Sequence, residues 1–350
     1  MRYLPTSKLM PGMALGQDIY DGAGRLLLAK HLLLSAEYIS DLEFLGFPGI
    51  YVDDEFTQGI EIQQILRPQM RRQALKMVYD LFSFDKDNKE PSVEEVKIQK
   101  IVESVVEDIT SNGDVMCNMM DIKNYDDYIY YHSINVGILS VMLGARYGLS
   151  KEKLCQLATA AFLHDIGKRF LDPDMINGEW QLKGQDQEVF KTHPKLGAEF
   201  LRSSYNFSSH VYVGVLEHHE RYDGQGYPLG RAGEALSLYA RIIRLADSYD
   251  TLTSECPSRK RLSPSDALEY LASKSGSEFD PNLVHIFTRK IAAYPVGCEV
   301  ELSNGQHAVV AKNFEDFPLR PLIKVVETGE MIHLRDDVNA RTIVVGRMIV

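Results

Sequence analysis

Residues 150–168 read SKEKLCQLATAAFLHDIGK, a run of helical composition that ends in a polar pair. Ser150 is well suited to cap the start of a helix, and the residues that follow have helical composition through Leu163. Two polar side chains, His164 and Asp165, come directly after the apolar run. Polar groups against a core are costly unless they are paired or bound to a ligand. The sequence therefore predicts a buried helix that carries a functional pair.

Further helices are predicted on both sides, from about residue 92 to residue 294. His132–Tyr147 repeats apolar residues at helical spacing and stops at Gly148, a residue type that commonly ends helices. Later helix starts are expected at Ser263-Pro264 and Asp280-Pro281, where proline takes the first helical position. We expect these segments to pack as a helix bundle.

Strand signals occur at both ends of the chain. Near the start, a helix at Ala36–Leu42 is expected before a strand at Gly49–Val52. In the tail, Asn304-Gly305 predicts a hairpin turn between two short apolar strands, and Gly329 separates a second pair. These patterns predict a small unit on each side of the bundle.

The predicted fold is mainly α, with four parts. They are a small mixed α/β N-terminal regulatory module (1–58), a helical linker (59–91), a helical catalytic domain (92–295) and a small β C-terminal subdomain (296–350).

Composition narrows the class of protein. The 350 residues are 45% apolar and 25% charged, which is typical of a globular protein, and the four cysteines form no CxxC pair. The formal net charge of -11 disfavours binding to a nucleic-acid polymer, although bound cations can still attract a small anionic substrate. No leader and no apolar run of about 18 residues is present, so we expect a cytoplasmic protein without a membrane span.

The predicted bundle contains seven side chains that are suited to bind metal. They are His132, His164, Asp165, His193, His218, His219 and Asp247. Imidazole and carboxylate together favour Fe, Mn, Zn, Ni or Co over Ca or Mg, and seven ligands are too many for one ion. We therefore predict a site for two divalent metal ions. Asp165 is the expected bridge, since adjacent residues on a helix diverge by about 100° and can reach neighbouring ions.

Other histidines are isolated in the sequence and are expected to be surface or structural residues. They are His31, His210, His285, His307 and His333.

The order and spacing of these motifs resemble the HD-GYP subgroup of the HD phosphohydrolase superfamily. The matching segments are Tyr130–Val136, His164–Lys168, His193-Pro194, His218–Glu220, Gly226–Pro228, Ala240–Ile242 and Ala246-Asp247. The resemblance implies an HD-type helix bundle, bound Fe or Mn, and hydrolysis of cyclic di-GMP to linear pGpG or on to GMP.

Phosphodiester hydrolysis suggests roles for individual residues. A hydroxide between two metals would attack phosphorus, Asp165 would orient it, and Lys168 would stabilise the added negative charge. Tyr227 is expected to contact a phosphate or a base; otherwise it is a turn residue that fills the rim of the bundle.

The chain departs from the family pattern at three places. Tyr128 stands where some members have a Glu that helps to bind a third metal, so we expect two. Cys256-Pro257-Ser258-Arg259 replaces a substrate-binding Arg-Pro-Tyr-Arg run, which leaves Arg259 as the expected substrate contact. The segment Arg169–Leu182 lacks the usual Lys-Pro-Gly.

The sequence leaves three alternatives open: a weakly active sensor of a cyclic dinucleotide, a hydrolase of another cyclic dinucleotide such as cyclic GMP-AMP, and a di-iron oxygenase. Lys168 and Gly226–Pro228 argue against the oxygenase, which has no special need for a phosphate clamp. The sequence also leaves open a homodimer or a signalling protein as partner.

Overall fold

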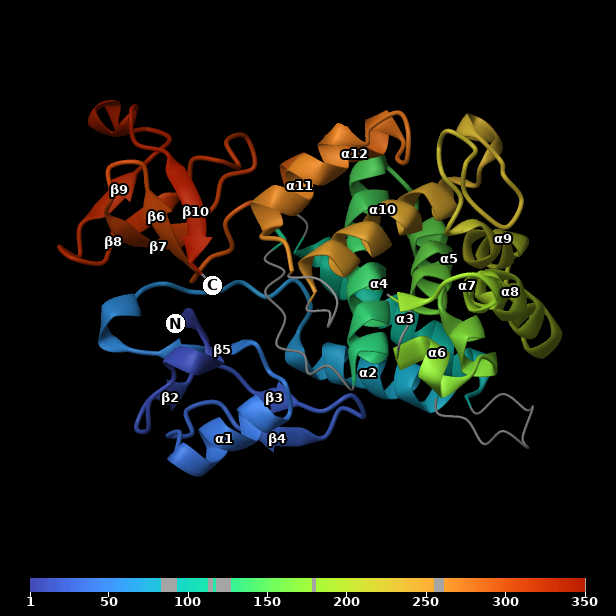
Figure 1. Cartoon of the computed structure of the whole chain (residues 1–350), viewed down its shortest axis with the longest axis horizontal. Coiled ribbons are helices and arrows are strands. Elements are labelled where there is room, and N and C mark those ends of the chain that lie inside the picture. Colours follow the sequence, from blue (N-terminus) through green and yellow to red (C-terminus); the bar gives the residue numbers. More distant parts are fainter. Residues whose placement is uncertain (83–92, 113–115, 118–126, 178–180, 255–260, 350) are drawn as a thin grey trace.

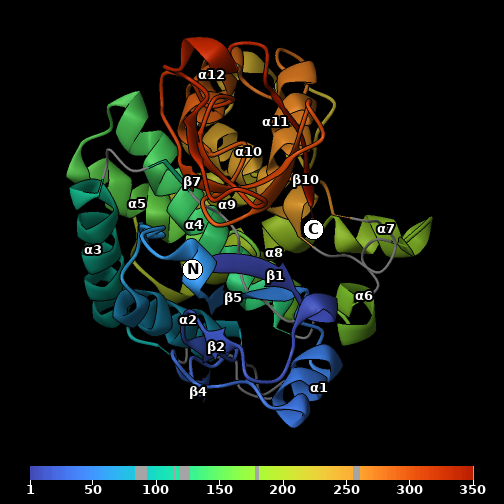
Figure 2. The same cartoon turned by 90° about the vertical axis from the view of Figure 1, so that its left-hand side faces the viewer.

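The computed structural model describes residues 1–82, 93–112, 116–117, 127–177, 181–254 and 261–349. Helices form the largest part of the molecule, and a small unit from each end of the chain lies beside them (Figure 1). Seen from the side of the small units, the C-terminal sheet lies above the N-terminal module (Figure 2). The predicted fold class, mainly α with a small mixed unit and a small β unit, is confirmed.

The N-terminal module is built around a short antiparallel sheet of order β1-β5-β2. Its elements are β1 (Arg2–Pro5), η1 (Thr6–Lys8), β2 (Ala14–Leu15), β3 (Ile19–Tyr20), β4 (Leu26–Leu28), α1 (Ala36–Phe44), β5 (Gly49–Asp53) and η2 (Glu55–Thr57). The predicted helix and strand correspond to α1 and β5. Leu15, Ile50 and Val52 belong to a hydrophobic core separate from that of the helices. The module therefore has its own source of stability.

The linker is helical over a shorter range than its composition suggests. Helix α2 spans Pro68–Phe82, whereas residues 60–67 are not helical. Proline restricts the residue before it to extended conformations and fits the first turn of a helix, which accounts for a start at Pro68. The proposed domain boundaries stay predictions.

The bundle surrounds one central helix, α4 (Tyr128–Tyr147), which is buried along most of its length. The other elements are α3 (Glu95–Ser111), α5 (Lys151–Phe162), η3 (Ile166–Phe170), α6 (Pro173–Asn177), α7 (Gln185–Phe190), α8 (His193–Ser204), α9 (Ser209–Glu217), η5 (Gly233–Ala235), α10 (Leu238–Thr253), α11 (Pro264–Ser273) and α12 (Pro281–Lys290). Helices α4 and α5 approach closely at Gly137, where an added Cβ would lie 2.1 Å from the Phe162 ring. Glycine at this position therefore allows the two helices to pack.

The predicted helix ends are confirmed where a cap defines them. Gly148 follows α4 with a φ of 94°, a conformation that glycine adopts without strain. The Ser150 side chain accepts a hydrogen bond from Lys153 N at the start of α5. Ser263 and Asp280 cap α11 and α12 in the same way, each before a proline.

The C-terminal unit is an antiparallel sheet of order β10-β6-β7-β8-β9. Its elements are β6 (Glu299–Leu302), β7 (His307–Lys312), β8 (Leu322–Val325), β9 (Met331–His333), η6 (Val338–Ala340) and β10 (Val345–Ile349). Both predicted strand pairs are confirmed. The inner residues of this sheet join the hydrophobic core of the bundle, so the two parts are packed together. None of the helices among the described residues combines the length and the apolar composition that a membrane span requires.

Candidate metal centre

The seven side chains suggested as metal ligands lie together, mostly at helix ends. His193 is the first residue of α8, and His218 and His219 directly follow α9. His132 and Asp247 stand on α4 and α10. The remaining pair, His164 and Asp165, lies in the turn between α5 and η3. Our explanation that helical neighbours diverge by about 100°, so that Asp165 can reach two ions, is therefore wrong, because neither His164 nor Asp165 lies in a helix.

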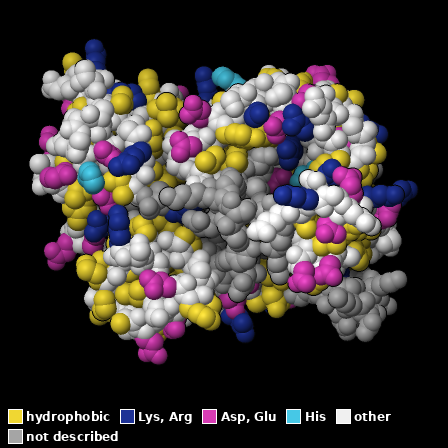
Figure 3. All heavy atoms as spheres, in the orientation of Figure 1, with side chains coloured by type: hydrophobic (Ala, Val, Ile, Leu, Met, Phe, Trp, Pro, Cys, Tyr) yellow, Lys and Arg dark blue, Asp and Glu magenta, His cyan; other side chains and the backbone are white. Residues whose placement is uncertain are grey.

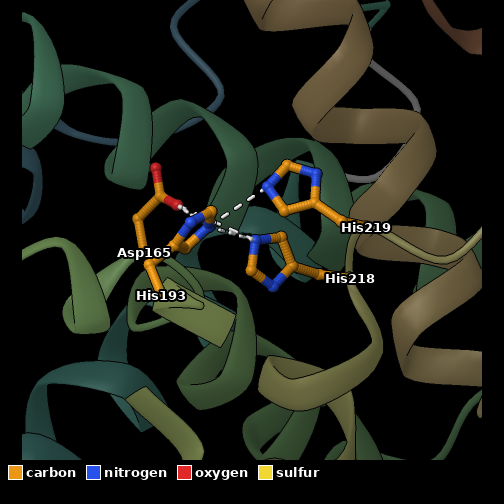
Figure 4. Close-up of side chains that lie close together, drawn as sticks. All are labelled: Asp165, His193, His218 and His219. Carbon is orange, nitrogen blue, oxygen red and sulfur yellow. Dashed lines mark hydrogen bonds and ion pairs between the residues drawn. The ribbon is translucent and has the colours of Figure 1, made fainter. Parts of the chain in front are cut away.

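One group of ligand atoms comprises Asp165, His193, His218 and His219, all within 4.8 Å of one another (Figure 4). Asp165 Oδ1 lies 3.3 Å from His193 Nε2 and 3.7 Å from His218 Nε2. His219 Nε2 lies 3.1 Å from His193 Nε2. Three imidazoles and one carboxylate oxygen thus converge on one point, which we call the first cluster.

The second cluster comprises His132, His164 and again Asp165. Here the other carboxylate oxygen, Asp165 Oδ2, lies 3.8 Å from His132 Nε2 and 3.5 Å from His164 Nε2. Asp247 adjoins this cluster, with Oδ1 3.3 Å from His132 Nε2. Each oxygen of Asp165 therefore faces a different cluster, as a bridging carboxylate would require.

The donor set suits divalent metal ions. His164 Nε2 and Asp165 Oδ1 are buried and have no hydrogen-bond partner among the described residues. His193 Nε2 faces two other ring nitrogens and a carboxylate oxygen, although a neutral imidazole nitrogen carries at most one proton. Buried polar atoms are rarely left without partners, and imidazole with carboxylate is a common ligand set for Zn and for Fe or Mn. The residues present therefore fit a metal centre.

Three of the histidines are oriented by backbone carbonyl groups. The Nδ1 atoms of His164, His193 and His218 lie 2.8, 2.8 and 2.6 Å from the carbonyl oxygens of the residues three positions earlier. This contact leaves Nε2 directed at the cluster, and histidines that bind metal commonly have such a partner on the other ring nitrogen.

His132 is oriented differently, by a side chain that the sequence analysis did not identify. Its Nδ1 lies 2.8 Å from Asp250 Oδ2, and Asn135 Nδ2 donates to Asp250 Oδ1 at 2.8 Å. Arg71 Nη2, on α2, donates to Asn135 Oδ1 at 3.3 Å. The sequence did contain a sign of this arrangement. Asn135 follows His132 by three residues and Asp250 follows Asp247 by three, a spacing that places each pair on one face of a helix.

Burial and nearby charges give the histidines different pKa values. Burial lowers the pKa of His132, but its hydrogen bonds with Asp247 and Asp250 outweigh that effect and raise the pKa to about 9. Burial dominates at His164 and lowers its pKa to about 3. For Asp165, burial acts to raise the pKa, yet Lys168 and the histidines hold it well below its usual value. Asp165 is therefore an ionised carboxylate in this setting.

Comparison with known proteins gives the family. Residues 106–283, just over half of the chain, match the model described as "HD domain". The chain belongs to the HD domain family.

Several relatives of this HD domain protein have names that state an activity. A cyclic di-GMP phosphodiesterase of Pseudomonas aeruginosa is 32% identical over 64% of this chain and 54% of its own length. The cyclic di-GMP phosphodiesterase response regulator RpfG of Xanthomonas campestris pv. campestris is 38% identical over 42% of this chain and 39% of its own length. The chain thus matches about half, or less, of these relatives' lengths.

A solved structure supports the fold over a longer range. An HDG"Y"P protein from Bdellovibrio bacteriovorus aligns with a TM-score of 0.52 at 16% identity, over 82% of this chain and 97% of that one. At this identity the likeness concerns the fold alone.

The turn after the His164-Asp165 pair depends on glycine in this HD domain. An added Cβ at Gly167 would lie 1.9 Å from the carbonyl oxygen of His193. The backbone of η3 therefore packs directly against the start of α8, which keeps Asp165 next to His193.

Two residues suggested as substrate contacts, Lys168 and Tyr227, lie against the two clusters of this HD domain. Lys168 is buried, and its Nζ lies 2.8 Å from Asp165 Oδ2. The Tyr227 ring stacks on the ring of His219 with a centroid distance of 4.8 Å. Arg259 lies outside the described residues. The isolated histidines belong to neither cluster, and Arg241 pairs with Asp280 at 2.6 Å, as a structural residue would.

Proposed function

We propose that this chain is a metal-dependent phosphodiesterase that hydrolyses a cyclic dinucleotide, with cyclic di-GMP as the first candidate. One observation carries the proposal: the two oxygens of Asp165 face two separate groups of buried histidines. Two-metal sites of this kind are common in enzymes that cleave phosphate esters. The names of the relatives favour a cyclic dinucleotide as the substrate.

The ligand set that we propose is His132, His164, Asp165, His193, His218, His219 and Asp247, with two ions of Fe or Mn. When bound, such ions supply positive charge and an activated water for attack on a phosphodiester. The mixed nitrogen and oxygen donors suit Fe, Mn, Zn, Ni or Co, and the resemblance to HD-GYP proteins favours Fe or Mn among these.

The chain's own residues would place the substrate and stabilise charge. Lys168 is held beside Asp165, where its ammonium group can neutralise charge on the phosphoryl oxygens. The ring centre of Phe190 lies 5.3 Å from Lys168 Nζ. Tyr227 offers a ring at the edge of the first cluster, in a position suited to contact a base or a phosphate.

The test is a product analysis on anaerobically purified protein supplied with Mn or Fe. Cyclic di-GMP, cyclic GMP-AMP and cyclic di-AMP are each incubated with the wild-type protein and with Asp165→Asn. We expect linear pGpG from cyclic di-GMP with the wild-type protein and none with the variant.

Other outcomes would overturn the proposal or change its substrate. Tight binding of a cyclic dinucleotide without product, in a protein that holds both metals, would identify a sensor. Substrate-dependent oxygen uptake would identify an oxygenase. Faster cleavage of cyclic GMP-AMP than of cyclic di-GMP would change the substrate but keep the reaction.

A further inference from the structure

Arg244 lies beside the metal centre but belongs to neither cluster. It stands on α10, three residues before Asp247, and its Nη1 lies 3.9 Å from Asp247 Oδ2. On the other side, Nη2 lies 3.4 Å from Glu278 Oε2, and the guanidinium group is 5.8 Å from the centre of the Phe279 ring. The side chain is 20% exposed, so it borders both the centre and solvent.

The donors of Arg244 are incompletely used. Its Nε is buried and has no hydrogen-bond partner in the described parts of the chain. The contact with Asp247 is longer than a hydrogen bond, and the one with Glu278 is at the upper limit. An arginine has five N–H donors in a planar fork that matches phosphate oxygens. This guanidinium group therefore retains capacity for an anionic ligand.

Glu278 does not require Arg244 as its partner. Arg221 Nη1 lies 3.3 Å from Glu278 Oε1, and Lys274 Nζ lies 3.8 Å from the same oxygen. The acid would keep two cations if Arg244 were replaced or turned toward a ligand. Charge balance at Glu278 therefore gives no sufficient reason for an arginine at position 244.

Arg244 and Lys168 are two separate cations at the edge of the centre. Lys168 is bound to the shared carboxylate itself, where a reacting phosphate would bind. Arg244 Nη1 lies 3.9 Å from Asp247 Oδ2, whereas the other oxygen, Asp247 Oδ1, lies 3.3 Å from His132 Nε2. Both charges are close enough to Tyr227 to oppose the effect of burial, which raises the pKa of that phenol. On the face shown in Figure 3, several Lys and Arg side chains gather over the part of the bundle where α10 lies in Figure 1, with Asp and Glu side chains among them.

We propose that Arg244 binds the second, non-reacting phosphate of a cyclic dinucleotide and so favours substrates with two phosphates over substrates with one. This inference rests on the proposed function, since it assigns a substrate contact at the same centre. A cyclic dinucleotide has two phosphodiesters, and only one can lie on the metals at a time. The other needs a cation at the rim, and Arg244 has donors to offer there.

The test compares two substrates and three variants. Cyclic di-GMP has two phosphates, whereas bis(p-nitrophenyl) phosphate has one. We expect Arg244→Ala to raise KM for cyclic di-GMP by about tenfold, the scale for loss of a charged hydrogen bond, with KM for the single-phosphate ester unchanged. Arg244→Lys should recover part of the loss. Lys274→Ala, which removes another partner of Glu278, is the matched control and should behave as the wild-type protein.

The outcomes of this test separate the possibilities. Equal losses on both substrates, or loss of bound metal, would show that Arg244 only supports Asp247 and would overturn the inference. If the wild-type protein cleaves the simple ester but not cyclic di-GMP, the proposed function fails. In that case, calorimetry measures the Kd of each variant for cyclic di-GMP. A higher Kd for Arg244→Ala, with the Kd of Lys274→Ala unchanged, would still support the phosphate contact. An unchanged Kd, or no binding by the wild-type protein, would overturn it.

Discussion

The two clusters share Asp165 but hold their histidines in different ways. His193 and His218 of the first cluster, and His164 of the second, are oriented by carbonyl groups near helix ends. His132 instead depends on Asp250, which in turn is held by Asn135 and through it contacts Arg71 of α2. A ligand oriented by the backbone tolerates changes in neighbouring side chains, whereas one oriented by a carboxylate does not. The second cluster should therefore be the more sensitive to substitutions outside the ligand set.

Replacing the shared residue should have the largest effect. Asp165→Ala removes the side chain that the two clusters share, so we expect loss of most bound metal and of hydrolysis. His164→Ala should also abolish hydrolysis, because it removes a ligand from the second cluster. Metal analysis and a turnover assay check this, with His210→Ala as a control for loss of a histidine. Two metals per chain and normal turnover in Asp165→Ala would refute the site.

Lys168→Ala should separate charge stabilisation from metal binding. Lys168 contacts the shared carboxylate but is not a ligand, so we expect both metals to remain and hydrolysis to slow by ~10². The measurement is kcat together with the metal content. A rate close to that of the wild-type protein would make Lys168 structural, and a loss of metal would show that its main role is to hold Asp165.

Asp250→Ala should affect one cluster alone. His132 would lose its hydrogen-bond partner, and loss of such a partner typically costs about 10–100-fold in metal affinity or activity. We expect one ion per chain to become weakly bound while the other stays tight, as measured by competition with a chelator. Asn135→Ala, one contact further away, should give a smaller change of the same kind. Equal weakening of both ions would contradict the difference between the clusters.

Tyr128→Phe should have the smallest effect. The Tyr128 ring stacks on that of His132 at 5.2 Å, and the Tyr128 hydroxyl lies 3.4 Å from His132 Nδ1. Phenylalanine keeps the ring contact, and His132 Nδ1 keeps its shorter contact of 2.8 Å with Asp250 Oδ2. A phenol is a poor ligand near neutral pH, so the wild-type protein should hold two metals and release mainly the linear dinucleotide. Metal content and a product time course should be the same for both proteins. Three tightly bound metals, or GMP formed as fast as the substrate disappears, would contradict this role.

Much of the fold could be predicted from the sequence, because the helix ends are marked by local chemistry. Gly148 and Ser150 mark helix boundaries without reference to the rest of the molecule, as do Ser263 and Asp280, the cap residues that each precede a proline. The start of α2 at Pro68 was missed because the residues before it have helical composition but no helical structure. Composition alone does not locate a boundary.

The sequence identified which residues would come together at the centre, but not how the backbone would place them. The suggested ligands lie together, yet His164 and Asp165 occupy a turn rather than a helix. Asp250 was missed because its role depends on a contact with His132, more than a hundred positions away. A single sequence does not reveal such long-range pairs. Binding of metal by these residues stays a prediction.

The shared carboxylate of Asp165 also determines how the site would load. A first ion would fix the carboxylate in place, so the second ion would not bear the entropic cost of ordering this side chain. The charge of the first ion would, however, repel the second ion, because the site is buried and weakly screened. The two ions would then bind in sequence with unequal affinities, and scarce metal would leave many chains half loaded. Turnover would follow the weaker affinity, so the response of this protein to metal supply would depend on one side chain.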